Sequence, residues 1–223
     1  MELSYWRSRW RKNKTGFHMP EGYPGLEAHW HRLQPENITS VLVPLCGKSV
    51  DLVWLSQHAD SVIGVEIAEE AITGFMKEQG RSWTEQTSGK FTIYDSGNIK
   101  IWCGDFMTLR HRQLPSLDLI YDKAALTALP PVMRRRYAGK ICDLSNSNTQ
   151  YLLHHFIYNQ EEMNGPPFSI SHKEISKYFK NVFAIEELST EKLDPKKFPK
   201  FVKRGLKSTI TERFLLLKPK KSI

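Results

Sequence analysis

The sequence lacks the features that define several classes of protein. It has no apolar run of the roughly 18 residues that span a bilayer, and no internal repeat or low-complexity tract. Its first six residues do not show the basic-then-apolar layout of a secretory signal. Hydrophobic residues make up 40% of its 223 residues and charged residues 25%, which is ordinary globular usage. We therefore expect a single globular domain over 1–223 that has no membrane partner.

Cysteine is also scarce. Cys46, Cys103 and Cys142 lie 57 and 39 residues apart and form no C-x-x-C pair. An odd number of cysteines does not make a closed disulfide framework. Cysteines without a disulfide pattern are typical of a cytoplasmic protein, in which thiols stay reduced. No His/Cys cluster has the spacing of metal ligands, so no metal site is predicted.

The charge balance is basic, with 32 Lys and Arg against 24 Asp and Glu and a formal net charge of +8. The basic residues concentrate only at 134–136, at 196–207 and in a tail at 219–223. Because no motif combines them with aromatic residues in a known nucleic-acid-binding pattern, we expect no nucleic-acid partner.

Apolar runs alternate with helical patterns from residue 40 to residue 218, after an aromatic, irregular segment at 1–39. Gly80 is placed to end one predicted helix, and Ser171 to Glu174 has capping-box spacing. Such alternation is typical of βαβ units and a largely parallel sheet, in which ligands bind at the carboxyl ends of the strands. The predicted strands are 41–45, 61–66, 100–105, 117–122, 151–158, 182–188 and 212–217, and the predicted helices are 49–58, 69–79, one from 130–131 and one after 171.

The first of these strand ends reads Gly47-Lys48-Ser49, like the end of a phosphate-binding P-loop. That motif requires glycine five positions before Gly47, where this chain has Leu42. The three glycines of the dinucleotide fingerprint are also missing. A nicotinamide-dependent oxidoreductase is therefore disfavoured.

Acidic residues follow the second and third strands. Glu66 lies 19 residues after Gly47, the spacing at which a carboxylate accepts hydrogen bonds from a ribose; the alternative is a solvated glutamate. Asp105 could accept a hydrogen bond from an adenine amino group while the ring of the following Phe106 covers the base. The alternative is that Asp105 begins an ordinary helix. An adenosine ligand without a pyrophosphate site indicates S-adenosylmethionine.

The aromatic N-terminal segment fits a cationic ligand. Trp6, Trp10 and Phe17 could form a lid over a sulfonium, because aromatic faces within about 6 Å stabilise cations. The alternative is a packed segment that covers the edge of the sheet.

Together these residues resemble the thiopurine S-methyltransferase family, and its bacterial branch more closely than its animal branch. The resemblance follows the chain in order, and its most specific parts are PLCGKS and GPPFS. The matching segments are 5–10, 16–18, 41–49 with Asp51 and 54–55, 64–66, 102–106, 121–126, 128–131, 165–169 and 205–206.

The resemblance implies a class I, Rossmann-like methyltransferase fold: a seven-stranded, mostly parallel sheet with helices on both faces and an antiparallel final hairpin. It implies S-adenosylmethionine as cofactor and S-adenosylhomocysteine as product. The residues implied to bind the cofactor are Trp6, Trp10, Leu45, Glu66, Asp105, Phe106 and Lys123, and those implied near the substrate are Phe17, Lys123 and Lys200.

Two of these positions depart from the family. Lys123 and Lys200 stand where the family usually has arginine, and lysine keeps the charge but loses the planar fork. Tyr23 stands where bacterial members often have asparagine. The cofactor site should survive these changes, whereas affinity for a planar heterocyclic thiol is the property that they put at risk.

The expected activity is in-line transfer of a methyl group to the thiolate of a small aromatic or heterocyclic thiol by a monomer. Such thiols ionise near neutral pH, so no general base is required. Asp122 is a weak candidate proton acceptor, and anchoring the turn after its strand is the preferred interpretation. Methylation of selenium or tellurium oxyanions is the alternative function.

Overall fold

The computed structural model describes residues 3–220, so positions 221–223 of the predicted basic tail lie outside the described residues. The chain divides into two compact units, Met1–Tyr121 and Asp122–Ile223, and the division falls inside one strand. A single functional domain over 1–223 stays a prediction. No helix among residues 3–220 is both long and apolar enough to cross a bilayer.

The first unit is built on parallel strands in the order β5-β2-β1-β6. All five residues of β1 are buried, which explains why these strands read as continuous apolar runs. The four strands that the sequence predicts here are confirmed to within two residues. They are β1 (Ser40–Pro44), β2 (Ser61–Glu66), β5 (Ile99–Cys103) and β6 (Leu119–Lys123).

Two further strands of this unit are absent from the sequence prediction. The antiparallel hairpin β3 (Thr84–Ser88) and β4 (Phe91–Ser96) pairs with β5. Residues 3–220 therefore hold nine strands, not the seven that the resemblance implies. Thr84–Ser88 escapes detection because it is a polar, largely exposed edge strand without an apolar face.

The helices of the first unit show that the expectation of an irregular N-terminal segment is wrong. The N-terminal segment is not irregular, since it contains α1 (Leu3–Arg11), α2 (Pro24–Trp30) and the short η1 (Pro35–Asn37). Gly80 caps its helix as predicted: with φ +59°, its N–H donates to the Lys77 carbonyl while the Arg81 N–H donates to that of Met76. The remaining helices are α3 (Asp51–Ser56), α4 (Glu69–Glu78), η2 (Phe106–Thr108) and η3 (His111–Gln113).

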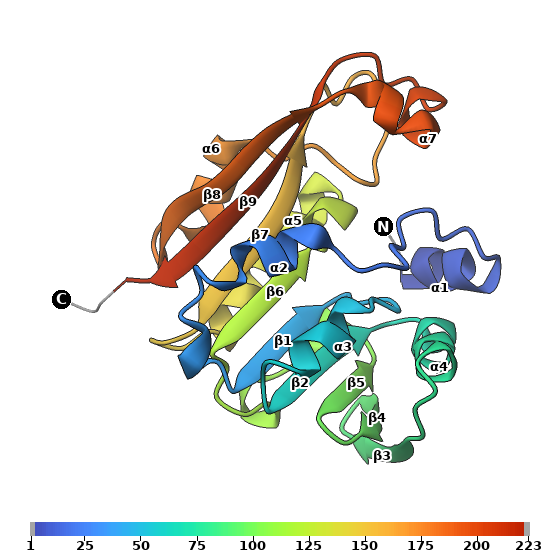
Figure 1. Ribbon diagram of the computed structural model, residues 1–223, viewed down its shortest axis with the longest axis vertical. Helices are drawn as coiled ribbons and strands as arrows, with labels where there is room; N and C mark the ends of the chain where they lie inside the picture. The colour runs from blue at the N-terminus through green and yellow to red at the C-terminus, as the bar shows by residue number, and fades with distance from the viewer. Residues whose placement is uncertain (1–2, 221–223) are drawn as a thin grey trace. The chain divides into compact units, whose positions relative to one another are not determined.

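The second unit contains three antiparallel strands in the order β7-β9-β8, which confirms the final antiparallel hairpin. The long β8 and β9 are the orange-red pair of arrows in Figure 1. The elements are η4 (Leu126–Ala128), α5 (Pro131–Leu144), β7 (Gln150–Ile157), α6 (His172–Phe179), β8 (Phe183–Leu193), η5 (Pro195–Lys197), α7 (Pro199–Val202) and β9 (Ile210–Pro219).

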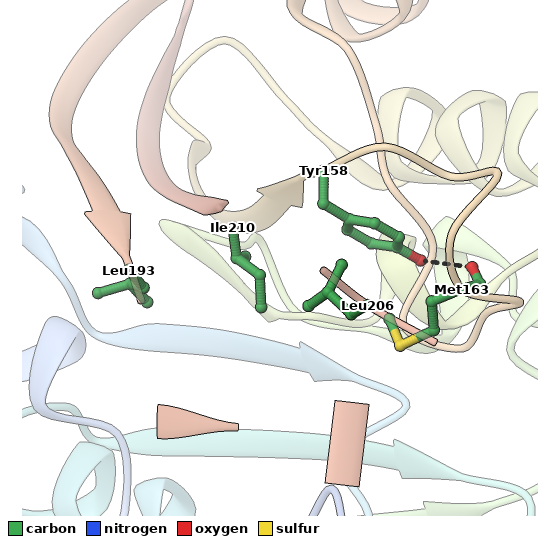
Figure 2. Close-up of a cluster of buried hydrophobic side chains, with 5 residues drawn as sticks. All are labelled: Tyr158, Met163, Leu193, Leu206 and Ile210. Atoms are coloured by element: carbon green, nitrogen blue, oxygen red, sulfur yellow. Dashed lines mark hydrogen bonds between the residues drawn. The ribbon is translucent and has the colours of Figure 1, made fainter. Parts of the chain in front are cut away.

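A small apolar cluster joins the loops at one end of these three strands. Figure 2 shows its five buried side chains, with the Tyr158 hydroxyl donating to the Met163 carbonyl. The cluster fixes the loop that contains the GPPFS segment to the segment that follows α7. Its members are Tyr158, Met163, Leu193, Leu206 and Ile210.

The basic run at 134–136 is not one charged surface. Arg134 is only 2% exposed, and its guanidinium pairs with the Glu174 carboxylate at 2.9 Å. Its Nε also donates to the Leu129 carbonyl. Arg134 therefore links α5 to α6, and this run provides no continuous basic patch.

Candidate active site

The loop after β1 turns sharply at the carboxyl end of the strand. Leu45 and Gly47 both have left-handed backbones, with φ of +50° and +56°. A branched residue such as leucine is strained there, and such strain gathers at functional sites. A Cβ on Gly47 would lie 2.8 Å from the Trp10 ring, so only glycine lets the two approach. The predicted cofactor residue Trp10 thus lies against the loop that contains Leu45.

Glu66 ends β2 beside that loop and is only 6% exposed, so the alternative of a solvated glutamate is wrong. Its Oε2 accepts from the Gly47 N–H at 2.8 Å, and its Oε1 accepts from the Ile67 and Ala68 N–H groups at 2.7 and 2.8 Å. Burial raises the pKa of this carboxyl, and the three N–H groups oppose that rise. Because a carboxylate offers about four acceptor positions, one remains on Oε2.

Asp105 and Phe106 follow β5, the neighbour of β2. The Gly104 N–H donates to the Glu66 carbonyl at 2.8 Å, so the two strand ends lie together. Asp105 Oδ1 accepts from the Met107 N–H and caps η2, as the helix-start alternative expects. Its Oδ2 has no partner among the described residues. Phe106 is buried at 4% exposure.

The three predicted lid aromatics form one cluster. Phe17 meets Trp6 and Trp10 edge-on, each with ring centroids 5.5 Å apart. Trp10 is buried against Ala68 and Ala71 at the start of α4, whereas Phe17 remains 41% exposed. The cluster therefore packs on the first unit and also presents an open aromatic ring.

Two contacts that the sequence did not predict hold α1 in place. The Arg7 Nε donates to the Ile67 carbonyl at 3.1 Å, directly after Glu66. The Arg11 Nε lies 3.5 Å from a carboxylate oxygen of Glu70. The basic Arg11 and the acidic first turn of α4 are the only signal that could have revealed the second contact. The first contact is to a backbone carbonyl, for which the sequence has no signal.

Asp122 belongs to the second unit and is fully buried. Its Oδ2 accepts from the Tyr137 and Tyr151 hydroxyls at 2.7 and 2.8 Å, and its Oδ1 accepts from the Ala125 and Leu126 N–H groups at 2.7 and 3.2 Å. All four acceptor positions are thus occupied. The geometry supports the anchoring role over that of a proton acceptor.

Lys123 and Lys200, the two departures from the family, also belong to the second unit. Lys123 is the half-buried last residue of β6, and the following Ala124 has a left-handed backbone with φ +62°. Lys200 lies exposed on α7. Their contacts with cofactor and acceptor stay predictions.

The side chains at the β1, β2 and β5 ends fit an adenosine better than a phosphate. Glu66 and Asp105 are acceptors with spare capacity, as ribose hydroxyls and an adenine amino group require. The one nearby lysine of the motif, Lys48, is already paired with Glu78 at 2.5 Å. Acceptors therefore dominate these strand ends, and anion binding there is disfavoured.

This fold is that of S-adenosylmethionine-dependent methyltransferases. A methyltransferase of this class from Anabaena variabilis matches with a TM-score of 0.65 at 16% identity, covering 98% of this chain and 95% of its own. The Burkholderia thailandensis 1,6-didemethyltoxoflavin-N1-methyltransferase, solved with S-adenosylhomocysteine, also matches with 0.65 at 12% identity, covering 98% and 87%. The predicted α/β, Rossmann-like class is confirmed.

Sequence comparison then narrows the class to a family. The family model "Thiopurine S-methyltransferase (TPMT)" matches residues 1–220. Relatives named thiopurine S-methyltransferase are 39% identical in Pseudomonas fluorescens, over 92% of this chain and 94% of theirs, and 39% identical in Vibrio parahaemolyticus, over 96% and 98%. The chain belongs to the thiopurine S-methyltransferase family and is a methyltransferase that depends on S-adenosylmethionine.

Proposed function

We propose that the protein methylates the sulfur of a small aromatic or heterocyclic thiol. The thiolate forms a bond to the methyl carbon as the bond from that carbon to the sulfonium breaks, and the thiol proton passes to solvent. Family membership supports the acceptor class. The observation that carries the proposal is the cluster of Trp6, Trp10 and Phe17, which lies against the loop after β1.

The first unit would hold S-adenosylmethionine, which supplies an electrophilic methyl group when bound. Glu66 would accept from a ribose hydroxyl through the free position on Oε2, and Asp105 from the adenine amino group through Oδ2. The left-handed turn at Leu45 would bring backbone close to the ligand, as such turns do. Gly47 supports this arrangement because its N–H fixes the Glu66 carboxylate.

The aromatic cluster would face the sulfonium and keep water from the reacting atoms. The ring of Trp10 is held by Ala68 and Ala71, so little conformational freedom is lost when a cation binds against it. The exposed Phe17 supplies an apolar surface for a planar acceptor. Catalysis would then come mainly from alignment of sulfur and methyl carbon in a site shielded from water.

Lysine side chains would supply positive charge in place of a general base. Asp122 has no acceptor position left, so it does not take the thiol proton. Lys123 would favour the thiolate or hold an acidic substituent, and Lys200 would contribute to binding of the acceptor. Aromatic thiolates form near neutral pH, which makes a dedicated base unnecessary.

Incubation of the protein with S-adenosylmethionine and 6-mercaptopurine tests this proposal. We expect mass spectrometry to detect S-methyl-6-mercaptopurine, formed together with S-adenosylhomocysteine. If S-adenosylhomocysteine binds but no thioether forms, the acceptor assignment is wrong. Volatile methylated products from selenite or tellurite would then identify the oxyanion alternative.

Two control titrations exclude the other classes considered. Calorimetry with a nicotinamide dinucleotide should give no binding heat, because the glycine fingerprint is missing. Any affinity for a DNA duplex should be weak, and a steep fall of that affinity with salt would instead mark phosphate contacts. The monomeric state and the cytoplasmic location remain parts of the proposal, to be measured by light scattering and by fractionation.

A further inference from the structure

Asp51 is a buried carboxylate in the first unit to which the proposed reaction assigns no role. It begins α3 and is only 3% exposed. Its Oδ1 accepts from the Tyr23 N–H at 2.8 Å, and its Oδ2 accepts from the Tyr121 hydroxyl at 3.1 Å. One side chain thus joins the N-terminal segment, α3 and β6.

The turn at Gly22 and Tyr23, which contacts Asp51, has a backbone conformation that fits the carboxylate. Gly22 has a left-handed backbone with φ +77°, and a Cβ there would lie 2.9 Å from Asp51 Oδ1. Any other residue at 22 would be strained and would push against the carboxylate. The Gly22–Tyr23 turn therefore fits Asp51 through both its conformation and its lack of a side chain.

The segment between α1 and this turn is held at its two ends. At one end, Trp10 packs on Ala68 and Ala71, and at the other, the Tyr23 N–H meets Asp51. Between them, Phe17 and Met19 remain 41% and 42% exposed. The two attachments restrain residues 12–21 while leaving their apolar side chains open.

We propose that Asp51 is a positioning residue that holds residues 12–21, and with them Phe17, in place beside Trp10. This rests on the proposed function insofar as those aromatics face cofactor and acceptor. The contact uses the backbone N–H of Tyr23, so it does not depend on the side chain at position 23.

Limited trypsin digestion of the full chain tests the attachment without any ligand. Lys12 and Lys14 are exposed cleavage sites in the held segment, and Lys196 and Lys197 serve as internal references in the second unit. Asp51→Ala should increase cleavage at 12 and 14, relative to the references, by about tenfold, because two hydrogen bonds to a charged group are lost.

Asp118→Ala is the matched control. Asp118 Oδ2 also anchors backbone, accepting from the Thr39 and Ser40 N–H groups, both at 3.0 Å, but it does so at the amino end of β1. This variant should leave the cleavage ratio unchanged. Equal ratios in Asp51→Ala and Asp118→Ala would overturn the proposal.

Two milder variants keep the test decisive if Asp51→Ala does not fold. Tyr121→Phe removes one hydrogen bond, and Gly22→Ala strains the turn, so each should raise the ratio about threefold. An unchanged ratio in both would equally overturn it.

Enzyme assays then separate positioning from a purely structural role. Tyr121→Phe should raise KM for the thiol severalfold, whereas Asp118→Ala, which also loses carboxylate hydrogen bonds, should leave KM unchanged. An unchanged KM in Tyr121→Phe would contradict the positioning role. If the wild-type protein methylates no thiol, the proposed acceptor fails while the cleavage result still decides the role of Asp51.

Discussion

Glu66 in the first unit and Asp122 in the second are both buried carboxylates near the ends of buried strands, yet they differ in what they can still bind. Asp122 accepts four hydrogen bonds, two of them from tyrosine hydroxyls, and is saturated. Glu66 accepts three, all from backbone N–H groups. Burial alone therefore does not distinguish these two carboxylates, whereas the unused acceptor position leaves only Glu66 of this pair able to accept from a ligand, as the proposed function requires.

The largest effect should follow removal of the saturated carboxylate. Asp122→Ala leaves the Tyr137 and Tyr151 hydroxyls and two N–H groups without an acceptor, and should lower the free energy of unfolding by about 4 kcal/mol. Urea denaturation measures this loss. Asp122→Asn, which keeps the shape of the side chain, should lose clearly less stability. Similar losses of stability in the two variants would contradict the claim that all four hydrogen bonds to Asp122 contribute.

His155 extends the comparison to a buried group whose ring nitrogens have no hydrogen-bond partner among the described residues. Burial, with the nearby Arg213 charge, lowers its pKa from 6.5 to about 3. Between pH 6.5 and pH 3, His155 is protonated in the unfolded chain but stays neutral in the folded chain. Stability should therefore fall on acidification towards pH 3, by about 1.4 kcal/mol per pH unit.

His155→Phe should remove that part of the pH dependence. Between pH 6.5 and pH 5 the wild-type protein should lose about 2 kcal/mol more than the variant in urea denaturation. Equal losses in the two proteins would show that His155 is protonated in the folded state.

Sequence reasoning succeeds where local chemistry decides the structure. The apolar pattern predicts the strand Ser61–Glu66 to the residue, and the position of Gly80 predicts a helix cap. The capping box at Ser171 is half right. Ser171 accepts from the Glu174 N–H, but the Glu174 side chain pairs with Arg134 instead of the helix start.

What could not be predicted depends on partners distant in sequence. Tyr137 and Tyr151, which saturate Asp122, lie 15 and 29 residues away from it, and no spacing rule connects them. For the same reason Asp51 could be recognised as part of a motif but not as a link to Tyr23. Residue types at strand ends predict where a candidate site lies. Which of their acceptor positions remain unused can be determined only from the structure.

A smaller effect should separate two left-handed glycines of the first unit. Gly80→Ala introduces backbone strain alone, since nothing lies within 4 Å of the added Cβ, and should cost about 1 kcal/mol. Gly47→Ala adds a clash with Trp10 and disturbs the N–H that Glu66 accepts. Only Gly47→Ala should weaken binding of S-adenosylhomocysteine in calorimetry, and equal affinities in the two variants would contradict the role of this loop.

The smallest effect concerns the acceptor. Lys200→Arg restores the planar fork and should lower KM for 6-mercaptopurine about threefold without changing stability or cofactor affinity. Lys203→Arg, three residues further on, is the control and should leave KM unchanged. Steady-state kinetics would refute the acceptor role of position 200 if the two variants behaved alike.

The most direct test of the central claim is calorimetric titration of S-adenosylhomocysteine into the wild-type protein, Glu66→Ala and Asp122→Asn. We expect Asp122→Asn to bind like the wild-type protein, and Glu66→Ala to bind at least about tenfold more weakly. Undiminished binding by folded Glu66→Ala, or a comparable loss in Asp122→Asn, would contradict the claim that the unsaturated carboxylate is the one that holds the cofactor.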